Sequence, residues 1–169
     1  MVAKTLEKAP PLHKTRIDLP EDVREKIVSR LNQSLASLLD LKTHTKQAHW
    51  NVKGKDFYQL HELFGTLATE AEAYVDLVAE RITTLGGTAL GTARLSASAS
   101  VLPEYPHDIF QGSDHIRALS DRYATLAKHV RESSDFADEA GDASTADLYT
   151  EVSRGLDMRL WFLEAHVQS

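Results

Sequence analysis

The stretch KDFYQLHELFGTLATEAEAYVDLVAERITTLGG, residues 55–87, decides the fold. Its apolar residues recur every three or four positions, as on one face of an α-helix. They are Leu60, Leu63, Phe64, Leu67, Tyr74, Val75, Val78 and Ile82. The pair Gly86-Gly87 ends the pattern, because glycine is common just past the end of a helix. The stretch therefore predicts a helix of about eight turns, which is long for a globular protein.

Three further amphipathic helices are expected around it. The first begins after Pro20, since proline fits the first turn, and ends at Gly54. Another ends by Gly141, and the last follows Ser144 as its N-cap. Their apolar faces are marked, in chain order, by Val23, Ile27, Leu31, Leu35 and Leu38, then by Ile116, Leu119, Tyr123, Leu126 and Val130, and then by Leu148, Val152, Leu156, Leu160, Leu163 and Val167.

The connection over residues 86–107 separates these helices into two pairs. It contains Gly91, Pro103 and Pro106, so it is too long and too broken for a tight turn, and we expect a crossover with one short helix. Short first and third links around one long middle connection are typical of the ferritin-like four-helix bundle. The fold class is therefore predicted to be all-α, although periodicity alone leaves other all-helical arrangements open.

Composition sets the domain organisation. The 169 residues, 42% of them hydrophobic, are enough to bury one core. There is no cysteine, so a metal would have to be held by imidazole and carboxylate groups. Neither a signal-peptide run near the start nor a segment of roughly 18 apolar residues occurs. We expect one domain over residues 21–169, a flexible tail over residues 1–20, and a place in the cytoplasm.

Charge divides the tail from the body. Residues 1–20 carry four basic and two acidic side chains, a net charge of +2. Because the whole chain has a net charge of −6, residues 21–169 carry −8. Pro10, Pro11 and the absence of helical periodicity predict a mobile arm. Two interpretations stay open: a solvated terminus, or non-specific, salt-sensitive DNA contacts that add up over the many arms of a multimer.

Metal-ligand side chains mark the first two helices, at His49 and at His61, Asp76 and Glu80. Because an α-helix rises about 1.5 Å per residue, His61 and Asp76 lie roughly 22 Å apart and cannot share one coordination sphere. Two antiparallel copies that cross near Ala68 and Ala71 would bring His61 of one chain to Asp76 and Glu80 of the other, twice by symmetry. The sequence therefore predicts a metal site between subunits.

Seven short motifs are similar to those of one known family. They are His49-Trp50-Asn51-Val52, His61-Glu62-Leu63-Phe64, Asp76-Leu77-Val78-Ala79-Glu80-Arg81, Leu85-Gly86-Gly87, Leu102-Pro103-Glu104-Tyr105-Pro106, Thr145-Ala146-Asp147-Leu148-Tyr149 and Leu160-Trp161-Phe162-Leu163-Glu164. Beyond the tail, the chain resembles the Dps family, the DNA-binding proteins from starved cells, also called mini-ferritins. The resemblance implies a hollow dodecamer that oxidises Fe(II) with hydrogen peroxide or oxygen, stores Fe(III) mineral and protects DNA.

The resemblance also implies the ligands of a ferroxidase centre. They fall on His49 and His61 of one subunit and on Asp76 and Glu80 of its two-fold mate, in agreement with the helix geometry. Imidazole and carboxylate suit iron because together they accept both Fe(II) and Fe(III). Taken singly, each of these residues is more often structural or solvated, so the interpretation depends on the whole set.

Position 65 departs from the family pattern. The resemblance places a further aspartate one helical turn after His61, where this chain has Gly65. Glycine inside a helix costs about 1 kcal/mol relative to alanine, so local helix preference does not explain it. Loss of a direct ligand predicts weaker metal binding and slower oxidation, with assembly intact. The alternative function is then a non-catalytic shell that condenses DNA or sequesters metal.

Further candidates come from the same resemblance. Trp50 is implied to lie close to the metal and to quench radicals, whereas packing at a helix interface is the other interpretation. Asp138, Asp142 and Asp147 surround the start of the last helix, where similar proteins form an acidic three-fold pore that attracts cations. Helix capping and solvation are the alternative roles for these three carboxylates.

Two other patterns are interpreted as structural. Glu104 and His107 match the Glu-x-x-His motif of di-iron bundles, but two prolines place them in a loop. Four further histidines show no carboxylate constellation, and we expect them to face solvent or to pack: His44, His115, His129 and His166.

Overall fold

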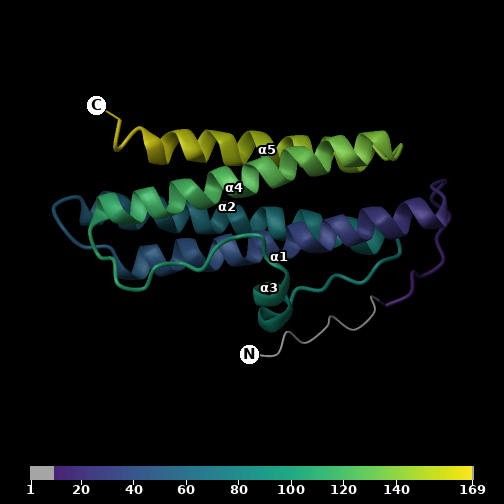
Figure 1. The fold of residues 1–169 in the computed structure, drawn as a ribbon, viewed down its shortest axis with the longest axis horizontal. Coiled ribbons are helices and arrows are strands. Elements are labelled where there is room, and N and C mark those ends of the chain that lie inside the picture. Colours follow the sequence, from purple (N-terminus) through teal and green to yellow (C-terminus); the bar gives the residue numbers. More distant parts are fainter. Residues whose placement is uncertain (1–9, 169) are drawn as a thin grey trace.

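A computed structural model of the chain describes residues 10–168. This part of the chain forms five α-helices and no β-strand: α1 (Glu21–Asn51), α2 (Phe57–Thr84), α3 (Ala93–Ala99), α4 (Gly112–Glu139) and α5 (Ala143–Glu164). The four long helices lie side by side along the long axis, and the short α3 lies beside α1 (Figure 1). The predicted all-α bundle with a short helix in its crossover is confirmed.

The lengths of the connections decide which helices pair. Residues 52–56 fold α2 back against α1, and residues 140–142 fold α5 back against α4. The long crossover, residues 85–111, returns the chain to the opposite end of the bundle, so that α2 and α4 run parallel (Figure 1). Because the link over residues 52–56 is short, the end of α1 and the start of α2 lie next to each other, and residues at these two ends can meet.

Two helix ends differ from the predictions. α1 ends at Asn51, whereas Gly54 lies in the following turn with φ of +110°, a conformation that glycine adopts without strain. The N-cap of α5 is Asp142 and not Ser144: the Asp142 side chain accepts a hydrogen bond from the Thr145 backbone amide at 3.0 Å. An aspartate suits this position because its negative charge also interacts favourably with the helix dipole.

The hydrophobic core lies where the apolar faces of the long helices meet. Its most enclosed side chains include Ile27, Leu31, Leu35, Leu38, Leu41, Phe64, Leu67, Ile82, Leu119, Tyr123 and Tyr149. Most of these positions are the ones that helical periodicity marks as apolar. None of the helices within residues 10–168 has both the length and the apolar character needed to cross a membrane.

Buried polar groups fix how the two helix pairs meet. Ser34 of α1 lies 3.0 Å from His129 Nε2 on α4 and 2.9 Å from the Tyr149 hydroxyl on α5. Burial raises the pKa of Tyr149 to about 12, so its phenol stays protonated at neutral pH. His129 therefore has the packing role expected from the sequence.

The crossover is held by a second buried cluster. The Tyr105 hydroxyl lies 2.8 Å from His115 Nδ1, and Arg122 packs over the Tyr105 ring. Burial raises the pKa of Tyr105, so its hydroxyl stays protonated at neutral pH. Glu104 and His107 are both exposed in the crossover, as predicted for a Glu-x-x-His match outside a helix.

The described part of the tail, residues 10–20, is not helical. The His13 backbone amide donates a hydrogen bond to the Gly86 carbonyl at 2.7 Å, and Leu12 and Ile17 pack against the core. Lys14 and Arg16 are exposed. The flexibility and DNA contacts predicted for residues 1–20 stay predictions, and residues 1–9 lie outside the described residues.

The buried histidines predict that mild acid destabilises the bundle. Desolvation lowers the pKa of both His115 and His129 below the ordinary value of 6.5. The unfolded chain then binds more protons than the folded chain as pH falls below about 6.5, so stability is lost in that interval. We expect the thermal unfolding midpoint to fall between pH 7 and pH 5, and to fall less in His115→Gln and His129→Gln variants. His166→Gln, at an exposed site, is the control, and equal slopes in all variants would contradict the prediction.

Candidate metal centre

His49 and His61 meet across the junction of α1 and α2. His49 lies in the last turn of α1 and His61 in the first turns of α2. Their rings stack with centroids 3.7 Å apart and planes inclined by 23°. Each Nδ1 lies against the other residue's carbonyl oxygen, at 2.7 Å for His49 Nδ1 and 2.9 Å for His61 Nδ1. The structure thus places together the two histidines that the sequence singled out.

The bond between His61 Nδ1 and the His49 carbonyl follows from the end of a helix. The last carbonyls of a helix have no partner within it. The amide four residues after His49 belongs to Lys53, and it donates to the Phe110 carbonyl, which leaves the His49 carbonyl free for His61. A carbonyl oxygen can only accept, so each Nδ1 carries the proton and each neutral ring keeps its lone pair on Nε2. Such bonds orient a histidine for metal binding and raise its basicity.

Gly65 gives the His49 ring the space that this arrangement needs. A Cβ atom at position 65 would lie 3.3 Å from both Cε1 and Nδ1 of His49, a tight contact that the ring would have to relieve by shifting. Helix propensity alone disfavours this glycine by about 1 kcal/mol relative to alanine. The close approach of His49 from α1 therefore explains the glycine at position 65, which the sequence of α2 alone does not explain.

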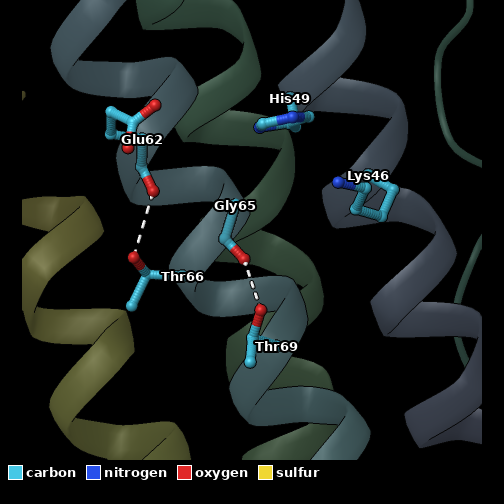
Figure 2. Close-up of a pocket in the computed structure, with 6 residues that line it drawn as sticks. All are labelled: Lys46, His49, Glu62, Gly65, Thr66 and Thr69. Carbon is cyan, nitrogen blue, oxygen red and sulfur yellow. Dashed lines mark hydrogen bonds between the residues drawn. The ribbon is translucent and has the colours of Figure 1, made fainter.

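An open pocket of about 440 Å³ lies beside His49. Its lining residues come from α1 and α2, and they are Lys46, His49, Glu62, Gly65, Thr66 and Thr69 (Figure 2). Sequence reasoning missed Lys46. The signal was available, because residues three apart on a helix lie on the same face and Lys46 precedes His49 by three positions.

Asp76 and Glu80 are not part of this cluster within one subunit. Both are exposed on α2, one helical turn apart, and roughly 22 Å or more along the helix from His61. Residues 10–168 contain no group of three or more histidine, aspartate or glutamate side chains able to hold a metal ion. Two imidazoles lie in one place and two carboxylates in another, so any four-ligand site needs a second copy of α2.

The crossing of two copies near Ala68 and Ala71 stays a prediction. Ala68 and Ala71 are 4% and 2% exposed, inside the core of their own subunit, and cannot line a contact with another chain. The exposed small residues at the same height are Thr66, Thr69 and Ala73. A contact at this height would therefore involve these exposed side chains and not the two buried alanines.

Trp50 lies at the surface beside this cluster. It is 66% exposed, and the Lys46 ammonium lies 5.6 Å from the centre of its ring. A tryptophan this exposed does not pack inside its own subunit. Contact with a second subunit and radical quenching near a metal both stay predictions.

The three pore candidates differ in their surroundings. Asp142 is buried, forms an ion pair with Arg81 at 2.7 Å and caps α5. Asp138 and Asp147 are exposed. The capping role considered for Asp142 accounts for its carboxylate, whereas an acidic pore remains a prediction that depends on the two exposed side chains.

Known proteins share both the sequence and the fold of this chain. Residues 28–169 match the family model for the ferritin-like domain. The DNA protection during starvation protein of Agrobacterium fabrum is 49% identical over 156 residues, which cover 92% of this chain and 96% of that protein. The DNA protection during starvation protein of Brevibacillus brevis is 30% identical over 146 residues, 86% and 97% of the two chains.

Solved structures agree with these relatives. DpsC from Streptomyces coelicolor has a TM-score of 0.91 at 30% identity, covering 98% of this chain and 97% of that one. A Dps protein from Vibrio cholerae O1, described as a member of a broad superfamily of ferritin-like diiron-carboxylate proteins, has a TM-score of 0.86 at 26% identity, covering 96% and 100%. The ferritin-like topology predicted from the connection lengths is confirmed.

The environments of the acidic residues predict different effects of mutation. Asp142→Ala removes an N-cap and leaves Arg81 without its partner, so we expect a loss of roughly 2 to 4 kcal/mol in the free energy of unfolding, measured by urea denaturation. Asp147→Ala, at an exposed site near the same helix start, is the control and should change this free energy by less than about 0.5 kcal/mol. Equal effects of the two substitutions would refute the assignment.

Proposed function

The chain belongs to the Dps family of ferritin-like proteins, and from this premise we propose that it is a ferroxidase and an iron store. Its copies form a hollow dodecamer in the cytoplasm, oxidise Fe(II) with hydrogen peroxide or oxygen at sites shared by two-fold mates, and keep the Fe(III) mineral inside. The relatives are named for protecting DNA during starvation. Here that protection follows from consuming Fe(II) and peroxide together, before they generate hydroxyl radicals.

The exposed face of α2 is the observation that carries this proposal. Exposed residues recur along it at alternating intervals of four and three, namely Glu62, Thr66, Thr69, Ala73, Asp76 and Glu80. These positions are symmetric about residue 71. An antiparallel copy related by a two-fold axis there sets Glu62 opposite Glu80 and Thr66 opposite Asp76. The carboxylates of one copy then lie beside the His49–His61 pair of the other.

Charge supports the same pairing. Within residues 10–168, the carboxylates of Glu62, Asp76 and Glu80 take part in no ion pair, whereas Glu70 pairs with Arg159 and Glu72 with Lys42. Glutamates brought opposite each other at a contact repel unless a cation lies between them. A divalent metal ion bound by both copies removes that repulsion and links metal binding to assembly.

The donor set suits Fe(II) as the substrate. Two imidazole Nε2 atoms and two carboxylates bind Fe(II) and still accept Fe(III) after oxidation. A pair of Fe(II) ions gives one electron each to a peroxide molecule, which with two protons becomes two waters. The chain's own contribution is to hold both imidazoles in one tautomer, so that their Nε2 atoms face the metal without a prior proton shift.

Gly65 favours the second candidate function, a shell that condenses DNA or sequesters metal without rapid oxidation. The position beside His49 has no side chain, so this subunit offers no carboxylate there. Peroxide-driven Fe(II) oxidation by the purified assembly, compared with a protein-free blank, separates the two functions. A trace that matches the blank would favour the shell.

A site shared between subunits predicts complementation between two inactive variants. We expect His61→Ala and Glu80→Ala assemblies each to lose rapid Fe(II) oxidation, because every site in them lacks one ligand. In assemblies formed from both chains, half of the two-fold pairs are mixed, and each mixed pair contains one intact site. About one quarter of the wild-type rate should then return, measured by absorbance of the Fe(III) product.

The complementation experiment has a matched control. Simple mixing of the two finished assemblies, without dissociation and reassembly, should restore nothing. No recovery in verified co-assemblies would show that the ligands do not come from two subunits, and the shared site would be abandoned.

The glycine at position 65 predicts an unusual gain of function. Gly65→Asp adds a carboxylate next to His49, and we expect it to tighten Fe(II) binding by about 10- to 100-fold and to speed oxidation. Gly65→Asn is the control, since it adds the same bulk against the His49 ring without the charge. If the natural protein oxidises Fe(II) as fast as Gly65→Asp, the hypothesis that Gly65 slows the reaction is wrong.

A further inference from the structure

The first residue of α4 lies on the corner between α1 and α2. α4 begins at the end of the bundle where α1 ends and α2 begins (Figure 1). A Cβ atom at Gly112 would overlap the Cδ1 atom of Leu60 in the first turn of α2, and it would lie 4.0 Å from Cγ2 of Val52, the C-cap of α1. Leu60 and Val52 are both 2% exposed. Three helix ends therefore meet closely at one glycine.

Space, and not backbone conformation, requires glycine at this position. The φ angle of Gly112 lies outside the left-handed region, so its backbone would suit any L-residue. What excludes a side chain is the close approach of Leu60, which is enclosed by the core and cannot turn aside freely. A larger residue at position 112 would therefore push against the first turn of α2.

A backbone hydrogen bond joins the end of the crossover to the same corner. The Lys53 amide donates to the Phe110 carbonyl at 2.8 Å, and the Lys53 ammonium lies 5.1 Å from the centre of the Phe110 ring. In a continuing helix this amide would donate to the His49 carbonyl, four residues earlier. The docked crossover takes that donor, and the His49 carbonyl accepts a hydrogen bond from His61 Nδ1 at 2.9 Å.

The histidine pair lies within one helical turn of these contacts. His61 directly follows Leu60, and His49 precedes Val52 by three residues. The two distances from Nδ1 to a carbonyl oxygen, 2.7 and 2.9 Å, leave little margin, because a displacement of about 1 Å takes either bond out of hydrogen-bonding range. Displacement of the first turn of α2 would therefore separate His61 from His49.

We propose that Gly112 is a positioning residue of the histidine pair. It acts through Leu60 and through the Lys53 amide: its missing side chain lets the crossover dock on the corner, and the docked crossover keeps the rings of His49 and His61 protonated on Nδ1, with Nε2 available. All of these contacts lie within one subunit, so the role does not depend on a second copy. Its consequence for metal binding rests on the proposed function, whereas the orientation of the pair depends on the fold alone.

Nitrogen NMR of the histidine rings tests this role in the iron-free assembly. In solid-state spectra of protein with labelled histidines, recorded at pH 8, His49 and His61 of the natural chain should each be protonated on Nδ1 alone. In Gly112→Ala the bonds are strained or broken, and we expect at least one of the two rings to show a substantial fraction protonated on Nε2. Gly91→Ala is the matched control: it also adds a methyl group to a crossover glycine, but this group makes an ordinary contact of 3.5 Å with Leu39, so both rings should keep their tautomer.

A second substitution separates positioning from a general loss of stability. Leu60→Val removes the Cδ1 atom that the new methyl group meets, so the double variant Gly112→Ala/Leu60→Val should regain the natural tautomers although it has lost a core methylene group. Leu60→Val alone should keep them. A protein that was merely destabilised would not recover on losing core packing. If Gly112→Ala alone does not assemble, assembly of the double variant with the natural tautomers supports the same clash.

Binding of Co(II), followed by its visible absorption, connects the pair to the proposed function. Gly112→Ala should weaken this binding about tenfold or more, because changes in the groups that orient metal ligands cost about 10- to 100-fold in affinity. The proposal is overturned if both rings of Gly112→Ala stay protonated on Nδ1 alone, or if the double variant does not restore that state. The NMR samples contain no metal, so failure of the natural assembly to bind Co(II) would refute the proposed metal centre and leave the NMR result intact.

Discussion

The rigidity of α2 is the constraint on which the rest of this structure depends. A straight helix of 28 residues holds His61 and the pair Asp76 and Glu80 roughly 22 Å apart, and no movement of side chains closes that distance. The subunit is therefore complete as a fold, whereas the proposed metal site needs a second copy. Under this proposal assembly and metal binding depend on each other, since the same face of α2 that would contact a second copy also carries the unpaired carboxylates.

The histidine pair depends on the end of α1, where the regular hydrogen bonding of the helix stops. Only a terminal turn leaves a carbonyl such as that of His49 without a helical partner, and only a short link returns the chain so that His61 reaches it. Gly65 then permits the two rings to approach. One glycine thus has two effects: it allows the imidazoles their orientation, and it removes a carboxylate from the space beside them.

Charges on α2 are divided between two tasks. Those that point to the rest of the subunit are used to hold the bundle together, as Glu70 does with Arg159 of α5 and Arg81 with Asp142 at the start of that helix. Those on the exposed face have no partner among the described residues. This division lets substitutions on the exposed face change binding while leaving the fold intact, because no contact of the core depends on them.

The sequence by itself determined the four long helices, their pairing and the separation of the ligands, because helical periodicity, stop residues and link lengths are local properties. It also singled out His49 and His61. Only the tertiary structure decided the reciprocal bonds of these histidines, the burial of Ala68 and Ala71, the cap at Asp142 and the pocket around Lys46. Each of these depends on how far one helix is rotated against its neighbour, and that rotation is set by packing among residues distant in the chain.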